Sequence, residues 1–185
     1  MKSIAFIDTE IDVKTQNVLD IGSIKSNGEV IHTPSMAAFK EFIKGTQFIC
    51  GHNIIKHDLK FIHRGLTEIN FDLSNIIDTL YLSPLLFPKK PYHSLVKDDK
   101  LQTEDKNNPL NDAKKAKDLF YDEFAAFQQL DETLQHIYYN LLCNKSEFKA
   151  FFTFVDLEVA RTNTEDLIRE KFYGEICRNV NLAKL

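Results

Sequence analysis

The sequence contains few cysteines and no spacing that would pair them. Only three of its 185 residues are cysteine, Cys50, Cys143 and Cys177, and none belongs to a C-x-x-C motif. An odd number of widely spaced cysteines argues against a disulfide framework and favours free thiols in a reducing compartment. We therefore expect a cytoplasmic protein.

Long apolar runs and an excess of positive charge are also absent. No apolar segment approaches the length of a membrane span, and the N-terminus leads at once into a predicted strand, which leaves no room for a signal peptide. The formal net charge of −4 provides no overall basic field, so a nucleic-acid partner would have to bind a local patch. The remaining composition, 43% hydrophobic and 27% charged, is that of a globular chain with one α/β core and a smaller appendage.

The segment that organises the chain is residues 3–10, SIAFIDTE. Its apolar residues, rich in β-branched and aromatic types, predict a buried central strand. The strand ends with Asp8 and Glu10, which point to the same face because side chains alternate along a strand. Two carboxylates this close favour a cation between them, and hard oxygen ligands suit Mg²⁺ or Mn²⁺ rather than zinc. A solvated strand end is the ordinary alternative for a lone D-x-E.

The rest of the chain alternates between strand and helix patterns. Strands are predicted at residues 17–25, 29–33, 47–50 and 75–79. The Asn27-Gly28 pair is typical of a two-residue hairpin turn between the first two of these. Helices are predicted at residues 34–45, 56–64 and 80–87, from Asp112 onward with Asn111 as the cap, and at residues 130–142, 146–154 and 164–178.

This order of elements predicts an α/β fold with a mixed five-stranded sheet that carries helices on both faces. Residues 1–128 would form this domain, and residues 129–185 would form a C-terminal helical extension. Ligands of such sheets collect at the carboxyl ends of the central strands. Asp8 and Glu10 are expected at that end, together with the loop that follows Cys50.

Two further acids stand in segments that match a known pattern. Asp58 follows Asn53 in the segment GHNIIKHDLKFI, and Asp112 lies in the segment NNPLNDAKKAKDLF. Each acid alone is more typical of the start of a helix. Together with the DTE of residues 8–10, and in this order, they resemble the three motifs of the DEDD superfamily of 3′–5′ exonucleases. The likeness is greatest to its DnaQ-like (DEDDh-type) domains and covers about residues 3–125.

The resemblance implies a ribonuclease H-like sheet and a phosphodiester hydrolase. Two Mg²⁺ or Mn²⁺ ions would be held by four carboxylates: Asp8, Glu10, Asp58 and Asp112. The enzyme would remove nucleoside 5′-monophosphates from the 3′ end of single-stranded nucleic acid, with DNA favoured. Four residues stand where the family touches the terminal nucleotide: Thr9, Ile11, His52 and Asn53. The resemblance also implies a role in DNA repair, with a helicase or polymerase as a partner or as a further part of a longer bacterial helicase-type chain.

One residue that the family requires is missing. The family has a general base, His or Tyr, five or four residues before its last Asp, where this chain has Asn107 and Asn108. An amide does not accept a proton as a base does. His93 is the best substitute, although capping or packing of a short helix is an equal alternative for it. The alternative function is a nucleic-acid-binding or regulatory module that keeps the acids for structure or weak metal binding.

Overall fold

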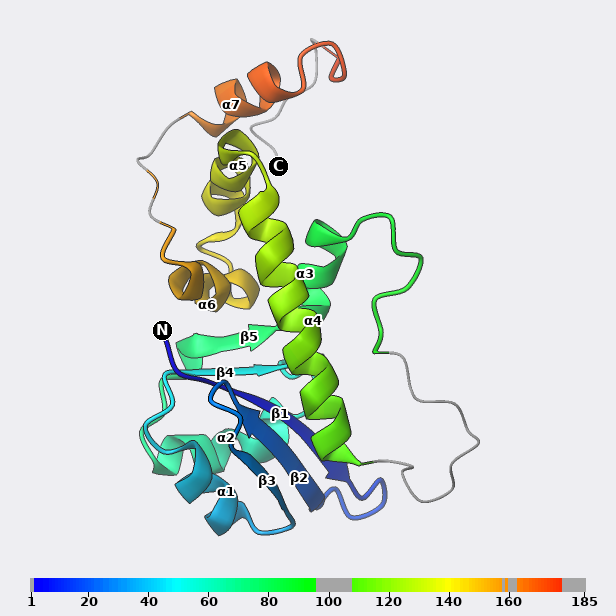
Figure 1. Cartoon of the computed structure of the whole chain (residues 1–185), viewed down its shortest axis with the longest axis vertical. Coiled ribbons are helices and arrows are strands. Elements are labelled where there is room, and N and C mark those ends of the chain that lie inside the picture. The colour runs from blue at the N-terminus through cyan, green and yellow to red at the C-terminus, as the bar shows by residue number, and fades with distance from the viewer. Residues whose placement is uncertain (1, 96–107, 158, 160–162, 178–185) are drawn as a thin grey trace.

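The computed structural model describes residues 2–95, 108–157, 159 and 163–177 and confirms an α/β fold (Figure 1). One sheet contains the strands β1 (Ile4–Ile11), β2 (Val18–Lys25), β3 (Val30–Thr33), β4 (Phe48–Gly51) and β5 (Ile76–Asp78). The α-helices of the described part are α1 (Met36–Ile43), α2 (Leu59–Glu68), α3 (Thr79–Leu86), α4 (Pro109–Gln129), α5 (Glu132–Leu142), α6 (Ser146–Val155) and α7 (Thr164–Lys171). A 3₁₀ turn, η1 (Leu73–Asn75), precedes β5.

The sheet is mixed and five-stranded, as predicted. Its strands lie in the order β3-β2-β1-β4-β5. β1 is antiparallel to β2 and parallel to β4, and β4 is parallel to β5. β2 and β3 are antiparallel and joined by the predicted turn, in which Gly28 has a φ of 93°. The carboxyl ends of β1, β4 and β5 therefore meet at one edge of the sheet.

Alternate residues of β1 pack into two separate hydrophobic cores. Ala5 and Ile7 pack with apolar residues of α1 and α2. Ile4 and Phe6 pack with apolar residues of α4 and α6 on the other face. Figure 1 shows α4 lying across this second face of the sheet. Helices thus cover both faces, which confirms that part of the fold prediction.

Two helices begin at different residues from those predicted. α4 starts at Pro109, earlier than predicted, because Asn108 and not Asn111 is its cap. The Oδ1 of Asn108 accepts a hydrogen bond from the N–H of Leu110 at 3.0 Å. Proline is favoured at the first helical position because it has no N–H to leave unpaired. α2 starts at Leu59, later than predicted, because the residues before it form turns.

The C-terminal helices pack in two places. Phe151 of α6 belongs to the same hydrophobic core as Phe6 of β1, so α6 covers the sheet beside α4. α5 and α7 pack against each other around Ile137 and Ile168. The predicted end of the last helix, Arg178, lies outside the described residues, and α7 is shorter than predicted. The chain therefore has a C-terminal helical part, and α6 of this part shares a hydrophobic core with the sheet.

Two of the predictions from composition concern the state of the cysteines and the presence of membrane-spanning segments. All three cysteines are free, as predicted. Cys50 lies inside β4, and burial raises the pKa of its thiol well above its usual value, so the thiol is uncharged at neutral pH. No helix in the part of the chain that the structure describes is long and apolar enough to span a bilayer.

Candidate functional site

Polar residues follow each of the three parallel strands where these strands end. Asp8 and Glu10 belong to the last residues of β1, His52 and Asn53 follow β4, and Asp78 is the last residue of β5. Because β1, β4 and β5 run in the same direction, these residues lie together at the carboxyl ends of the three strands. We refer to this end of the sheet as the candidate site.

The two carboxylates of β1 point toward α4. Ile4 and Phe6 belong to the core on the α4 side, and side chains two residues apart in a strand share a face. Asp8 and Glu10 therefore lie on the same side of the sheet as α4, and both are partly exposed. Thr9, between them, points to the opposite side and is buried.

A glycine of β2 brings the start of α4 onto this face. Gly22 is paired with Asp8 across the antiparallel strands, so a Cβ at Gly22 would point to the same face of the sheet as the Asp8 side chain. A Cβ on Gly22 would lie 2.1 Å from the backbone nitrogen of Leu110 and 2.2 Å from the carbonyl carbon of Pro109. The first turn of α4 thus rests directly on the strand beside Asp8. Asp112 belongs to that first turn.

His52 and Lys115 lie close to the carboxylate of Asp112. The Nζ of Lys115 is 3.3 Å from the Oδ1 of Asp112. Burial lowers the pKa of His52 to about 4, while the nearby negative charge of Asp112 acts in the opposite direction. The His52 ring is therefore neutral at physiological pH, and its Nδ1 lies 2.8 Å from the Oγ1 of Thr79. The structure thus brings the loop after β4 and the start of α4 together.

Asp58 is held on the other side of β1. Its Oδ1 accepts hydrogen bonds from the Thr9 hydroxyl at 2.6 Å and from the Thr9 N–H at 3.0 Å. Burial raises its pKa, whereas the Thr9 hydroxyl and the nearby His57 favour the charged form. The Nδ1 of His57 is 3.6 Å from the same oxygen. Asp58 precedes α2 but makes no capping hydrogen bond there, so its side chain serves β1 instead.

The hydrogen bond from the Thr9 hydroxyl to Asp58 predicts that the protein loses stability when this hydroxyl is removed. We expect Thr9→Val to lower the free energy of unfolding by about 1–3 kcal/mol, because the buried carboxylate of Asp58 loses one of its donors. Urea denaturation at pH 7 measures the change. Thr9→Ser keeps the hydroxyl and should restore most of the loss. Equal stabilities of the valine and serine variants would show that the hydroxyl contributes nothing.

The geometry differs from the expected convergence of four carboxylates. Among the residues that the structure describes, no group of three or more histidine, cysteine, aspartate or glutamate side chains is close enough to hold one metal ion. Asp58 is bonded to Thr9, on the face opposite to the one that carries Asp8 and Glu10. The donor chemistry still fits Mg²⁺ or Mn²⁺, since every acid of the set offers hard oxygens. Binding by all four would require their side chains to turn toward one ion from the positions that they take here.

The residues predicted to contact a nucleotide fall into two groups. Ile11 ends β1 after a register shift and is partly exposed, and His52 and Asn53 follow β4, so all three lie at the candidate site. Asn53 adopts a left-handed conformation with a φ of 64°. Thr9, in contrast, is buried and bonded to Asp58, which gives it a structural role in this conformation.

Of the two positions at which the exonuclease family carries its general base, one has a structural role here and the other lies outside the described residues. Asn108 caps α4, and Asn107 is not among the described residues. His93 is partly exposed, and its Nδ1 lies 3.1 Å from the Oγ of Ser83 in α3. The structure therefore ties His93 to α3. Whether it acts as the base stays a prediction.

Two residues that matter here were not predicted as site residues, although both left a signal in the sequence. Gly22 interrupts an otherwise apolar strand pattern, and a glycine inside a strand often marks the close approach of another backbone. Asp78 follows the apolar pair of Ile76 and Ile77 directly before a helix, a position typical of a helix cap. Its carboxylate also accepts hydrogen bonds from the loop after β4, which the sequence pattern does not indicate.

Glu123 of α4 is a buried acid that the sequence also did not single out. It is 0% exposed, and neither carboxylate oxygen has a hydrogen-bond partner among the residues that the structure describes. Burial raises its pKa to about 9, opposed by the charge of Lys90 and, weakly, by the nearby Ser83 hydroxyl. Asp78 and Asp122 act in the same direction as burial. Glu123 is therefore a neutral acid at physiological pH.

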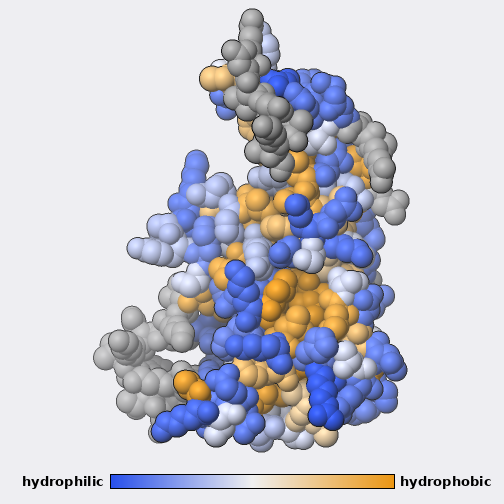
Figure 2. Space-filling model, turned by 180° about the vertical axis from the view of Figure 1, so that it is seen from behind, coloured by the Kyte–Doolittle hydropathy of each residue, from blue (hydrophilic) through white to orange (hydrophobic). Residues whose placement is uncertain are grey.

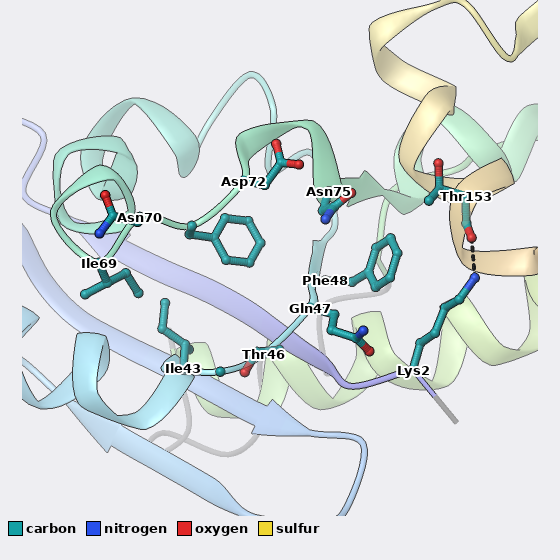
Figure 3. Close-up of a pocket in the computed structure, with 12 residues that line it drawn as sticks. Lys2, Ile43, Thr46, Gln47, Phe48, Ile69, Asn70, Asp72, Asn75 and Thr153 are labelled. Atoms are coloured by element: carbon teal, nitrogen blue, oxygen red, sulfur yellow. Dashed lines mark hydrogen bonds between the residues drawn. The ribbon is translucent and has the colours of Figure 1, made fainter.

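The surface has an apolar area on one face, and a pocket lies away from the candidate site. The view from behind shows apolar side chains gathered near the middle of that face (Figure 2). A pocket of about 510 Å³ lies at the beginning of β4, where Phe48, Ile69 and Phe71 line it together with Lys2 and Asp72 (Figure 3). Because β4 begins there and ends at the candidate site, the pocket lies at the opposite end of the strand.

Comparisons of the chain with protein-family models, with curated proteins and with solved structures returned no match.

Proposed function

We propose that this chain is a metal-dependent 3′–5′ exonuclease of the DnaQ-like kind, which removes nucleoside 5′-monophosphates from single-stranded nucleic acid, with DNA favoured. The observation that carries the proposal is the contact between Gly22 and the first turn of α4. This contact brings Asp112 to the face of the sheet that bears Asp8 and Glu10. Carboxylates from distant parts of a chain that gather at the end of a central strand are typical of metal-dependent phosphodiester hydrolysis.

The metal would be held by the acids of the candidate site. Asp8, Glu10, Asp58 and Asp112 would bind Mg²⁺ or Mn²⁺ once their side chains turn toward a common ion. Two such ions, when bound, neutralise the charge that develops on the phosphoryl oxygens and on the leaving oxygen. Oxygen donors of this kind favour these ions over zinc.

The terminal nucleotide would bind between the end of β1 and the loop after β4. These two segments are neighbours because β1 and β4 are paired. Ile11 offers a partly exposed apolar contact, and the neutral His52 ring and the Asn53 side chain offer hydrogen bonds. A strand that is held there by its 3′ end would present its last phosphodiester to the carboxylates. Positioning of this kind supplies a large part of the rate of phosphoryl transfer.

The test is cleavage of a single-stranded DNA oligonucleotide that is labelled at its 5′ end. We expect stepwise shortening from the 3′ end with Mn²⁺ and none with EDTA. Asp8→Asn and Asp112→Asn should each lower the rate on the order of 10²-fold or more, the scale on which the loss of an electrostatic stabiliser acts. Asp118→Asn is the matched control, because Asp118 is an exposed acid of the same helix. Cleavage that persists in EDTA, or in both site variants, would contradict the proposal.

A nucleic-acid-binding or regulatory module is the second candidate, and the base positions favour it. Asn108 is committed to capping α4, and His93 is bonded to Ser83. A positioned general base contributes about 10²–10⁴ in rate, so an enzyme without one would be slow rather than inactive. An oligonucleotide that binds in the presence of Mn²⁺ but is never shortened would favour the module over the exonuclease.

A further inference from the structure

The loop after β4 is held by the junction between β5 and α3. Asp78 ends β5, is 0% exposed, and accepts three backbone hydrogen bonds. Its Oδ1 accepts from the N–H of Asn53 at 2.8 Å and from the N–H of Leu80 at 3.0 Å. Its Oδ2 accepts from the N–H of Ile55 at 3.1 Å. One side chain thus fixes two backbone groups of a loop that lies more than twenty residues earlier in the chain.

Capping of α3 explains only one of these bonds. The Leu80 bond is the ordinary capping interaction of an aspartate before a helix. Asp72 makes the same kind of bond to the N–H of Ser74 at 2.9 Å, and Asp72 lies at the surface. The bonds from Asn53 and Ile55 contribute nothing to the cap of α3. They determine the path of the loop, including the left-handed conformation of Asn53.

The next residue, Thr79, holds the His52 ring. The Oγ1 of Thr79 lies 2.8 Å from the Nδ1 of His52 and donates to the carbonyl oxygen of Gly51 at 3.4 Å. The hydroxyl has one proton, so both bonds form at once only when it donates to Gly51 and accepts from an Nδ1–H group of His52. In this arrangement the neutral ring has its proton on Nδ1, and Nε2 is an acceptor. Thr79 is 0% exposed, so water does not compete for these bonds.

We propose that Asp78 and Thr79 are positioning residues of the candidate site, which brace residues 51–55 so that His52 and Asn53 meet the 3′-terminal nucleotide in one orientation. This inference rests on the proposed function. Asp78 fixes the loop backbone, and Thr79 fixes the tautomer and orientation of His52. Neither residue touches the substrate. Because they keep the loop ordered, the nucleotide binds without the entropic cost of ordering it first.

The first test separates substrate binding from chemistry. In steady-state cleavage of the oligonucleotide with Mn²⁺, Thr79→Val should raise KM about tenfold with a smaller change in kcat, in line with the loss of a buried hydrogen bond. Thr79→Ser keeps the hydroxyl and should stay within about twofold of the wild type. Asp78→Asn should raise KM at least as much, because an amide NH₂ has no acceptor for one of the three N–H groups. Asp72→Asn, which alters an exposed cap only, should leave KM unchanged.

The second test does not depend on activity. Nitrogen NMR of the wild type should show His52 with its proton on Nδ1, and Thr79→Val should abolish that preference. Hydrogen exchange of the Asn53 and Ile55 amides should be about tenfold faster in Asp78→Asn than in Asp72→Asn.

The outcomes distinguish the two proposals. If the wild type does not cleave DNA but gives these NMR and exchange results, the proposed exonuclease function is wrong. Asp78 and Thr79 would then still fix the conformation of the loop after β4. Two results would contradict the proposal that Asp78 and Thr79 position the loop. One is a His52 ring with its proton on Nε2, and the other is a KM that is unchanged in both Asp78→Asn and Thr79→Val.

Discussion

Replacing Gly22 with alanine should cost the protein both stability and cleavage activity. The added methyl group would lie 2.1–2.4 Å from backbone atoms of Pro109 and Leu110, and no rotamer change can relieve a contact with backbone. Either β2 or the first turn of α4 has to move. Overpacking of this kind costs about 1–3 kcal/mol, and more where backbone is displaced. A shift of about 1 Å at Asp112 would lower the rate on the order of 10²-fold.

Thermal melting and the oligonucleotide assay together measure this effect. Gly65→Ala is the matched control, because the Cβ there would meet the flexible end of the Met36 side chain, at 2.8 Å from its sulfur, and that side chain can move aside. We expect Gly65→Ala to cleave at the wild-type rate. A Gly22→Ala variant that melts and cleaves like the wild type would show that α4 does not depend on this contact.

Replacing Glu123 with glutamine should stabilise the protein in alkaline solution and remove a pH dependence. The pKa of Glu123 is raised from 4.5 to about 9, mainly by burial, so the folded state binds its proton more tightly than the unfolded state. The stability that this proton contributes is complete below about pH 4.5 and is lost as the pH rises toward 9. At pH 8, about 3.5 units above the ordinary pKa of 4.5, we expect Glu123→Gln to be more stable than the wild type by about 5 kcal/mol, since one pKa unit corresponds to about 1.4 kcal/mol.

Denaturation of both proteins between pH 5 and pH 9 tests this expectation. The two stability curves should lie close together near pH 5 and separate steadily as the pH rises. Glu170→Gln is the control, because Glu170 is an exposed carboxylate of α7 and its removal should leave the curves parallel. Parallel curves for Glu123→Gln would show that this carboxyl group reaches water or a partner when it ionises.

The strands were predicted well because their signal is local. The apolar run of residues 4–7 defines β1, and the Asn27-Gly28 turn fixes the pairing of β2 with β3. Helix starts were less certain where several capping residues compete. Residues 107–112 read NNPLND, and Asn108 is the cap because only this choice places Pro109 at the first helical position.

The candidate site was predicted in part. The sequence indicated that Asp8 and Glu10 share a strand end, and the β1 register agrees with this. It gave no sign that Asp58 would bond Thr9 on the opposite face, because that contact depends on how α2 packs against the sheet. The role of Asp78 was missed for the same reason, since its partners Asn53 and Ile55 come from a distant loop.

The two outer strands of the sheet have a consequence for association between molecules. β3 contains four residues and β5 contains three, and β5 is buried throughout. A long exposed edge offers unpaired N–H and C=O groups to a neighbouring chain and promotes aggregation through β-pairing. Edges this short give an incoming strand few hydrogen bonds to add. The sheet is therefore protected against edge-to-edge growth by the length of its outer strands.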